Sequence, residues 1–344
     1  MVVRLAVLLV FILSGIVYMI SMPGDSWSGP LPALSDAEQR SADRLRAHVE
    51  VLAGQIGERN VELPGALAAA AGYIRDTLAA EGYKVAAQHF TSLGHEVENL
   101  EVELAGSRLP DEIIVVGAHY DSVTGSPGAN DNGTGVAALL EIARLLAGQD
   151  LPRTVRLVAF VNEEPPFFYG EEMGSRVYAN RSRERGEQIR GMLALETIGY
   201  YTAEPGSQRY PFPFRFFYPD TGNFIGFVGN LGSRGLVRQA VAAFRASTAF
   251  PSEAVAAPGW MGGVHWSDHW SFWKAGYPAI MVTDTAPFRY PYYHSRADTP
   301  DRLDYTGLAR VTHGLLAVIR DLAGGGVVSM SGSAPRGGRG NKSP

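Results

Sequence analysis

The sequence predicts an α/β protein whose central sheet is covered by helices on both faces. Residues 113–116 are entirely apolar and residues 155–161 are apolar except for Arg156, which is typical of strands that are buried on both sides. Segments with apolar residues at helical spacing, such as residues 133–146, stand between the strand-like segments. Alternating strands and helices of this kind indicate a sheet with helices packed on both faces.

The same patterns place the individual elements. Ser35 and Asp36 can cap a helix that runs to about residue 52. The other expected helices are 67–81, 133–146, 236–246 and 305–322, and the expected strands are 84–90, 97–104, 112–117, 155–161, 192–195, 224–228 and 279–282.

Composition and charge exclude several classes of function. Of the 344 residues, 46% are hydrophobic and 19% are charged, as expected for a globular protein. The formal net charge of -5 gives no reason to expect nucleic acid as a partner. Because cysteine is absent, disulfides, thiolate nucleophiles and cysteine-ligated zinc are excluded.

Residues 1–22 predict export. Arg4 precedes an uncharged apolar run that is about long enough to cross a bilayer as one helix. We expect a retained transmembrane anchor rather than a cleaved signal segment, because no A-x-A-like site precedes Pro23. The positive-inside rule then places the bulk of the chain on the periplasmic or extracellular side, and cleavage would make it a secreted protein. A buried core helix is the alternative, but the position at the extreme N-terminus argues against it.

The rest of the chain divides into three parts. Residues 23–35 are rich in proline, glycine and serine and read as a linker. Residues 36–323 contain all the other expected elements and form the main domain. Residues 324–344 are rich in glycine, serine and arginine, so we expect a disordered tail.

Side chains that can bind metal follow several of the expected strands. His119 comes directly after the strand at 112–117, and Asp121 is placed to hold the second ring nitrogen of this histidine. Glu196 follows the short strand at 192–195, and His294 lies in a turn before the last helix. In open α/β sheets ligands bind at the carboxyl ends of strands. Each residue alone has an ordinary structural explanation, such as hydrogen bonding or exposure at the surface.

Two further segments add three carboxylates. Asp131 lies in a glycine-bounded turn that opens a helix, where it could bridge two cations or simply cap the helix. Glu163 and Glu164 end an apolar strand, and in an extended chain they would point in opposite directions. One could then bind metal while the other acts as a general base on water. Taken together, two histidines and three carboxylates suit two zinc ions that share a bridging carboxylate.

These motifs resemble the aminopeptidase Y type of co-catalytic di-zinc metallopeptidase. The resemblance covers about residues 40–322 and rests on the ordered set G-A-H-Y-D-S, A-N-D-N-G-T-G, F-V-N-E-E, M-G-S, L-E, S-D-H and Y-H-S-R-A-D-T. It implies a three-layer αβα sandwich with a mixed, mostly parallel sheet. It also implies a zinc exopeptidase domain at 36–323 that removes N-terminal residues from peptide substrates and carries two zinc ions per chain.

The resemblance also implies roles for individual residues. His119 and His294 would each be a terminal ligand of one zinc ion, and Asp131 would bridge the two. Glu164 would share a metal with one of the histidines, and Glu163 would be the general base. The remaining implied roles fall to Glu196 as a ligand, Asp121 as the residue that orients His119, and Tyr293 as a phenol that stabilises the oxyanion.

The chain departs from the family pattern at two places. Position 196 is Glu where the family more often has Asp, which lengthens the ligand by one methylene. The segment between Glu164 and Gly174 is longer than usual, and its Pro165–Tyr169 stretch predicts an aromatic wall beside the site, although these side chains could equally pack on the core. The aromatic stretch 263–269 could likewise form a wall of the substrate pocket or simply pack in the core.

Two rival functions stay open. Glutaminyl cyclases share this scaffold but act as acyltransferases with one zinc, and they generally lose part of the two-metal ligand set. A catalytically silent, membrane-bound peptidase-like binding protein is the other alternative, because fold alone does not establish activity. Residue specificity, amino- versus carboxypeptidase action, the metal used in the cell and the oligomeric state are not fixed by the sequence.

Overall fold

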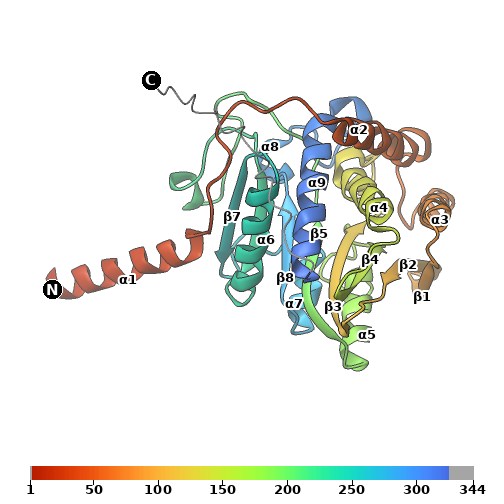
Figure 1. Cartoon of the computed structure of the whole chain (residues 1–344), viewed down its shortest axis with the longest axis horizontal. Coiled ribbons are helices and arrows are strands. Elements are labelled where there is room, and N and C mark those ends of the chain that lie inside the picture. Colours follow the sequence, from red (N-terminus) through yellow and green to blue (C-terminus); the bar gives the residue numbers. More distant parts are fainter. Residues whose placement is uncertain (1, 325–344) are drawn as a thin grey trace, which may run out of the picture.

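The computed structural model describes residues 2–324 and contains an eight-stranded sheet in the order β1-β2-β4-β3-β5-β8-β6-β7 (Figure 1). The strands are β1 Ala86–Ser92, β2 His95–Leu104, β3 Leu109–His119, β4 Arg153–Phe160, β5 Gln188–Leu195, β6 Ile225–Asn230, β7 Ser252–Ala257 and β8 Ala279–Thr283. Strands β4, β3, β5 and β8 are parallel neighbours, so their carboxyl ends share one edge. This confirms the expected mixed, mostly parallel sheet.

The sheet changes direction at β6. Strand β6 pairs antiparallel with β8 and parallel with β7. Because of this reversal, the beginnings of β6 and β7 lie at the same edge as the carboxyl ends of β5 and β8. Both strand ends and strand beginnings therefore contribute side chains to that edge.

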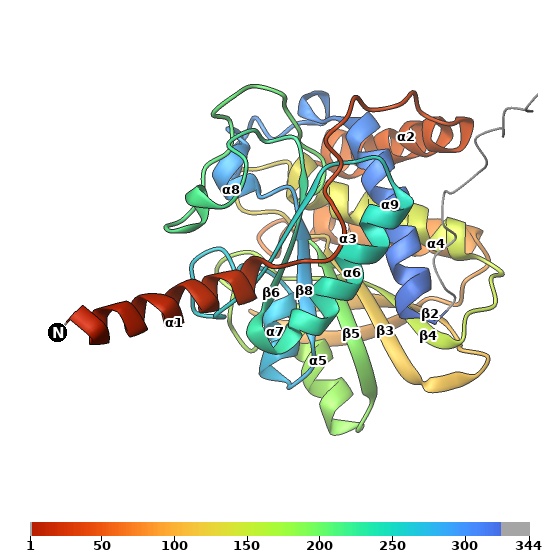
Figure 2. The ribbon, with the colours of Figure 1, turned by 60° about the vertical axis from the view of Figure 1, so that its left-hand side comes forward.

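Helices cover both faces of the sheet, as expected (Figures 1 and 2). Helices α2, α3, α4, α6 and α9 pack together on one face, and the shorter α5 and α7 cover the other. Helix α1 extends away from the body of the molecule. The helices are α1 Val2–Ile20, α2 Asp36–Val49, α3 Pro64–Ala80, α4 Gly135–Leu146, α5 Gly174–Glu184, α6 Arg234–Ser247, α7 His269–Lys274, α8 Ala286–Arg289 and α9 Tyr305–Leu322.

The two faces of the sheet explain the continuous apolar segments. In β3, Ile114 and Val116 join the larger hydrophobic core under α4 and α9, whereas Ile113 and Val115 join the smaller core under α5 and α7. Successive side chains of a strand point to opposite faces, so a strand covered on both sides needs apolar residues at every position.

Several expected elements are found with nearly the expected bounds, and others were missed. Helix α2 begins at the expected cap, where Ser35 and Glu38 form a reciprocal capping box. Strand β7 was not predicted because its sequence, S-E-A-V-A-A, is rich in alanine, which is not typical of strands. Helix α5 was also missed, because it is mostly polar and buries only a narrow apolar stripe around Tyr178 and Ala179.

The N-terminal and C-terminal expectations have different outcomes. Within the described part of the chain, no helix combines the length and the apolar character needed to cross a membrane. The expected anchor at 1–22 is therefore not supported. In the expected linker, Pro23 and Gly24 accept hydrogen bonds from Arg245 through their carbonyls, and Ser26 accepts one from the backbone N–H of Ser252. The expected disordered tail comprises residues 324–344, and all of it except Gly324 lies outside the described residues.

Candidate metal centre

Strand ends and loops at the carboxyl edge of the sheet carry the predicted ligands. His119 is the last residue of β3, and Glu196 directly follows β5. Glu164 lies just beyond β4, and Asp131 lies in the turn Ala129–Thr134 that leads into α4. His294 comes from the loop after α8, where its backbone has a positive φ of 54°. The fold thus brings together five side chains that are far apart in the sequence.

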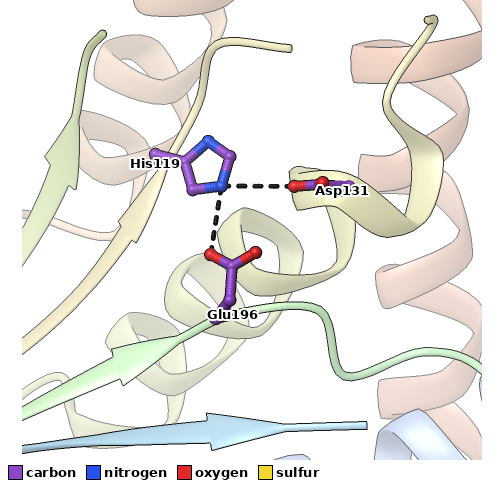
Figure 3. A group of neighbouring side chains, drawn as sticks. All are labelled: His119, Asp131 and Glu196. Atoms are coloured by element: carbon purple, nitrogen blue, oxygen red, sulfur yellow. Dashed lines mark ion pairs between the residues drawn. The ribbon is translucent and has the colours of Figure 1, made fainter. Parts of the chain in front are cut away.

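The first group of ligands surrounds the imidazole of His119 (Figure 3). His119 Nε2 lies 3.3 Å from Asp131 Oδ1 and 3.2 Å from Glu196 Oε2. All three side chains are buried. They come from three different elements and point toward one another. Such a set, one imidazole and two carboxylates, is a common ligand set for a divalent cation.

The second group uses the other oxygen of the same aspartate. His294 Nε2 lies 3.1 Å from Asp131 Oδ2 and 3.4 Å from Glu164 Oε2. In each group the candidate ligand atoms all lie within 4.8 Å of one another. Asp131 therefore presents one oxygen to each group, which is the arrangement expected of a bridging carboxylate.

The donor atoms of this centre fit a cation. Among the described residues, His119 Nε2, Asp131 Oδ1 and Glu164 Oε1 are buried and have no hydrogen-bond partner. Buried polar atoms without a partner are rare because each one costs free energy. A divalent cation would satisfy all three atoms, and the N and O ligands suit zinc. The residues present therefore fit the metal that the sequence implied.

The electrostatics of the centre also favour binding of a cation. Burial opposes protonation of His119, but the carboxylates of Glu196 and Glu163 outweigh it and raise its pKa well above the usual value. Burial raises the pKa of Glu164 well above its usual value, and the carboxylate of Asp131 adds to this effect. Carboxylates packed this closely repel one another, and a bound cation would relieve the repulsion.

Asp121 supports the centre in two ways. Its two carboxylate oxygens accept hydrogen bonds from the backbone N–H groups of Glu163 and Glu164, each at 3.1 Å. The Nδ1 atom of His119 is 3.2 Å from the backbone oxygen of Asp121 and 3.5 Å from its carboxylate. Asp121 therefore holds the two glutamates through their backbone and lies beside the imidazole.

The expectation that Glu163 and Glu164 point in opposite directions is wrong. Strand β4 ends at Phe160, and Asn162 has a positive φ of 59°, so the two glutamates are no longer in an extended strand. Glu163 Oε2 lies 3.8 Å from His119 Nε2, and Glu164 approaches His294. Both carboxylates therefore face the centre. Burial raises the pKa of Glu163 well above its usual value, against the effect of His119.

Two supporting residues were missed by sequence reasoning. Asp298 accepts hydrogen bonds from the backbone N–H groups of Asn130 and Asp131, and so fixes the turn that carries the shared aspartate. Its only sequence signal was its place in the Y-H-S-R-A-D-T motif. Arg59 is buried and donates to the backbone carbonyls of Tyr120 and Gly128. No local pattern marks Arg59, because its partners are distant backbone groups.

Two further side chains lie against the ligands. Ser267 donates a hydrogen bond of 2.8 Å to Glu196 Oε2, which fixes the orientation of that carboxylate. The ring of Tyr293 stacks on the imidazole of His294, with ring centroids 3.8 Å apart. Burial and the nearby carboxylates of Asp131 and Glu196 raise the pKa of Tyr293 well above its usual value. The phenol therefore stays protonated and can donate a hydrogen bond.

An open cavity lies beside the centre. Its empty space, open solvent at the mouth included, is about 770 Å³, and Glu196 and Tyr293 lie in its wall. The wall is rich in aromatic residues, namely Tyr210, Phe214, Tyr218, Phe224, Phe227, Trp266 and Phe288. The stretch Pro165–Tyr169, which was expected to form an aromatic wall beside the site or to pack on the core, does not line this cavity, and its Tyr169 ring packs against His265 and Trp270. In the stretch 263–269, Gly263, Val264 and Trp266 do line the cavity, whereas His269 is buried and contacts the carbonyl of Val264.

An αβα sandwich with two groups of histidine and carboxylate ligands at the carboxyl edge of its sheet defines the class of metal-dependent hydrolases. Comparison with known proteins gives the family. The family model described as Peptidase family M28 matches residues 99–319. The chain is 39% identical over 323 residues to the uncharacterized protein YfbL of Escherichia coli strain K12, covering 91% of this chain and 96% of that protein. The chain therefore belongs to peptidase family M28.

Solved structures agree with the fold. The zinc aminopeptidase BSAP from Bacillus subtilis superposes with a TM-score of 0.61 at 16% identity, covering 81% of this chain and 94% of that one. A glutaminyl cyclase from Fimbriiglobus ruber superposes with a TM-score of 0.62 at 20% identity, covering 87% and 98%. Both likenesses concern the fold, which is shared by the two enzyme classes.

Proposed function

We propose that this protein is a zinc-dependent aminopeptidase that binds two zinc ions per chain. The observation that carries this proposal is the pair of ligand groups that share Asp131, each with one imidazole nitrogen and a second carboxylate. His119 and Glu196 would hold one ion, and Glu164 and His294 would hold the other. Membership of peptidase family M28 supports peptides as the substrates.

The bound ions would supply Lewis acidity, which polarises the scissile carbonyl and lowers the pKa of water. Glu163 belongs to neither ligand group, yet its carboxylate lies within 3.8 Å of His119 Nε2. A general base needs this position, close to the reacting atoms and free to exchange a proton. Glu163 would take a proton from the attacking water and return it to the leaving amine.

Tyr293 would act on the developing negative charge. Its ring packs on His294 and its phenol stays protonated, as described above. A preorganised hydrogen-bond donor beside the developing oxyanion stabilises the transition state more than the ground state. The phenol of Tyr293 is the donor that this chain offers for that role.

We infer action at the N-terminus of peptides from a protein that shares this fold. The name of the structurally similar BSAP, a zinc aminopeptidase, agrees with this direction of attack.

A glutaminyl cyclase is the second candidate, because the likeness to the Fimbriiglobus ruber enzyme is as strong as that to BSAP. The experiment that separates them uses the full-length protein supplied with zinc. We expect release of p-nitroaniline from aminoacyl anilides, loss of this activity with a chelator, and about two zinc ions bound per chain. Formation of pyroglutamate from a peptide that begins with glutamine, with no anilide hydrolysis, would reject the aminopeptidase. Bound zinc with neither reaction would favour the silent binding protein.

Export of the domain at 36–323 is also a proposal. It is supported by the apolar run after Arg4 in residues 1–22. Cell fractionation with an antibody to the domain, together with N-terminal sequencing of the mature chain, tests it. Recovery of the uncleaved chain in the cytoplasmic fraction would refute it.

A further inference from the structure

The cavity beside the metal centre contains a carboxylate that the hydrolytic chemistry does not use. Glu253 is the second residue of β7, and its partly buried side chain lines the cavity together with Tyr210 and Tyr218. It lies far from the five ligands along the chain and has no role in holding the metals. A partly buried carboxylate in a wall rich in aromatic residues needs a hydrogen-bonding partner.

The described residues provide no hydrogen-bond donor to Glu253. Burial raises the pKa of its carboxyl group, and the opposing influence is the charge of Arg245, which acts through space. The neighbouring phenols are already committed, because Tyr210 donates to the carbonyl of Pro219 and Tyr218 to that of Ala254. Each phenol has a single proton, so neither can also serve Glu253.

Four of the five N–H groups of Arg245 are also used, and none of them donates to Glu253. The guanidinium group donates to the hydroxyl and carbonyl oxygens of Ser252 and to the carbonyls of Pro23 and Gly24. The carboxylate of Glu253 is thus an acceptor in the cavity wall whose partner must come from a ligand or from water.

The register of the sheet aligns Glu253 with the metal centre. Glu196 follows Leu195, which pairs with Val282, and the next residue, Thr283, pairs with Gly226, which pairs with Glu253. These pairings put Glu196, Thr283, Gly226 and Glu253 in one row across four strands, and all four line the cavity. Three strand spacings of about 4.8 Å separate the ends of this row, or about 14 Å between the two Cα atoms. Because Gly226 has no side chain, the middle of the row is open.

We propose that Glu253 selects substrates whose N-terminal residue carries a cationic side chain, lysine or arginine. This inference rests on the proposed aminopeptidase function. The aliphatic stem of such a side chain packs along the aromatic walls, and its charged head reaches the far end of the row. There the head makes a charge-assisted hydrogen bond with Glu253 and contacts the faces of aromatic rings.

The same arrangement disfavours apolar side chains. A leucine or norleucine side chain in the cavity would displace water from the carboxylate of Glu253 and offer no donor in return. A site that leaves a polar group unpaired rejects the ligand that lacks the matching group. Selection therefore results from both attraction of the cation and exclusion of its apolar analogue.

Binding of L-lysinamide and L-norleucinamide tests the proposal, because the two differ only by the terminal ammonium group. Titration calorimetry would use the full-length protein with zinc supplied and with Glu163→Gln in every sample, so that the amides bind without being hydrolysed. We expect lysinamide to bind at least about tenfold more tightly, and Glu253→Gln to remove this preference while norleucinamide binding stays within about threefold. Asp220→Asn is the matched control, since it removes one exposed carboxylate outside the cavity wall and should keep the preference.

Hydrolysis of the lysyl and norleucyl p-nitroanilides completes the test. Equal binding of the two amides when Glu253 is intact, or a preference that survives in Glu253→Gln, overturns the role of Glu253. A stronger preference for tyrosinamide than for lysinamide overturns it too, because the selected group would then be a phenol. Preferential lysinamide binding without hydrolysis of either anilide rejects the proposed function and supports the cation pocket. Hydrolysis of both anilides without a preference for lysine supports the proposed function and rejects the cation pocket.

Discussion

Asp131 is the residue through which the two ligand groups depend on each other. Its Oδ1 atom faces His119 and its Oδ2 atom faces His294, while Asp298 holds its backbone in place. Glu196, by contrast, belongs to one group alone. Replacement of these two carboxylates should therefore have different consequences for metal content.

We expect Asp131→Asn to lower bound zinc from about two ions per chain to less than one, because an amide offers a single oxygen and no charge. Glu196→Gln should remove about one ion only. Metal analysis after dialysis measures both, with Glu171→Gln, an exposed carboxylate, as the control. Equal zinc loss in Asp131→Asn and Glu196→Gln would show that Asp131 does not bridge.

Glu163 should matter for turnover and not for metal binding. We expect Glu163→Gln to lower kcat by a factor of about 10²–10⁴, since general-base catalysis is typically worth that much, while zinc content stays unchanged. Glu164→Gln is the comparison, because it should lose zinc as well as activity. A kcat within about tenfold of the unmodified protein would assign the base to another residue.

At the level of single residues, the side chains that carry the chemistry could be predicted from the sequence, whereas of their supporting residues only Asp121 was predicted. His119, Glu164 and Glu196 follow apolar strands, and parallel strands end at one edge, so their convergence could be predicted. Arg59 and Asp298 act by hydrogen bonds to backbone groups far away in the chain. Such partners are set by the tertiary structure and leave no local pattern.

Among the secondary-structure elements, α4 and α2 are joined by a buried charge network. Glu141 of α4 accepts hydrogen bonds from Arg44 and Ser41 of α2 and from Arg144. Burial would raise the pKa of Glu141, but Arg144, Arg44 and Ser41 outweigh it and lower the pKa from 4.5 to about 2. The charged form of Glu141 is therefore stabilised by folding.

This network predicts a pH-dependent contribution to stability. Because the folded pKa is depressed, the contribution is complete above the unfolded pKa of 4.5 and is lost as the pH falls toward about 2. We expect Glu141→Gln to lower the free energy of unfolding by about 2 kcal/mol at pH 7, with a smaller difference at pH 3. Urea denaturation of both proteins across this range measures it. A difference that does not change with pH would contradict the assignment.

The helices and strands that could be predicted have a clear pattern of apolar residues, and the missed ones lack such a pattern. The run at 113–116 and the periodicity of α9 each reflect burial against one or two cores. Strand β7 is alanine-rich and is held in the sheet by pairing with β6, so its sequence alone does not favour a strand. The cavity that β7 helps to form was therefore outside the reach of sequence reasoning.

For the molecule as a whole, metal binding should be coupled to folding. The ligands meet only in the folded chain, where three buried carboxylates face one another. Zinc at about 100 times its Kd should stabilise the fold by about 2.7 kcal/mol and raise Tm by roughly 4–5 °C. Differential scanning calorimetry with zinc and with a chelator measures the change. Asp131→Asn should show little increase, and an unchanged Tm in the unmodified protein would argue against a zinc centre.

The reversal of strand direction at β6 places the hydrolytic groups and the cavity for the substrate side chain on different segments of the chain. The ends of β3, β4 and β5 supply the hydrolytic groups, whereas the beginnings of β6 and β7 supply the open floor at Gly226 and the acid at Glu253. Mutations in the second set can alter which peptides are accepted without disturbing the first. Proteins of this family that differ in β6 and β7 could thus accept different peptides while keeping the same hydrolytic residues.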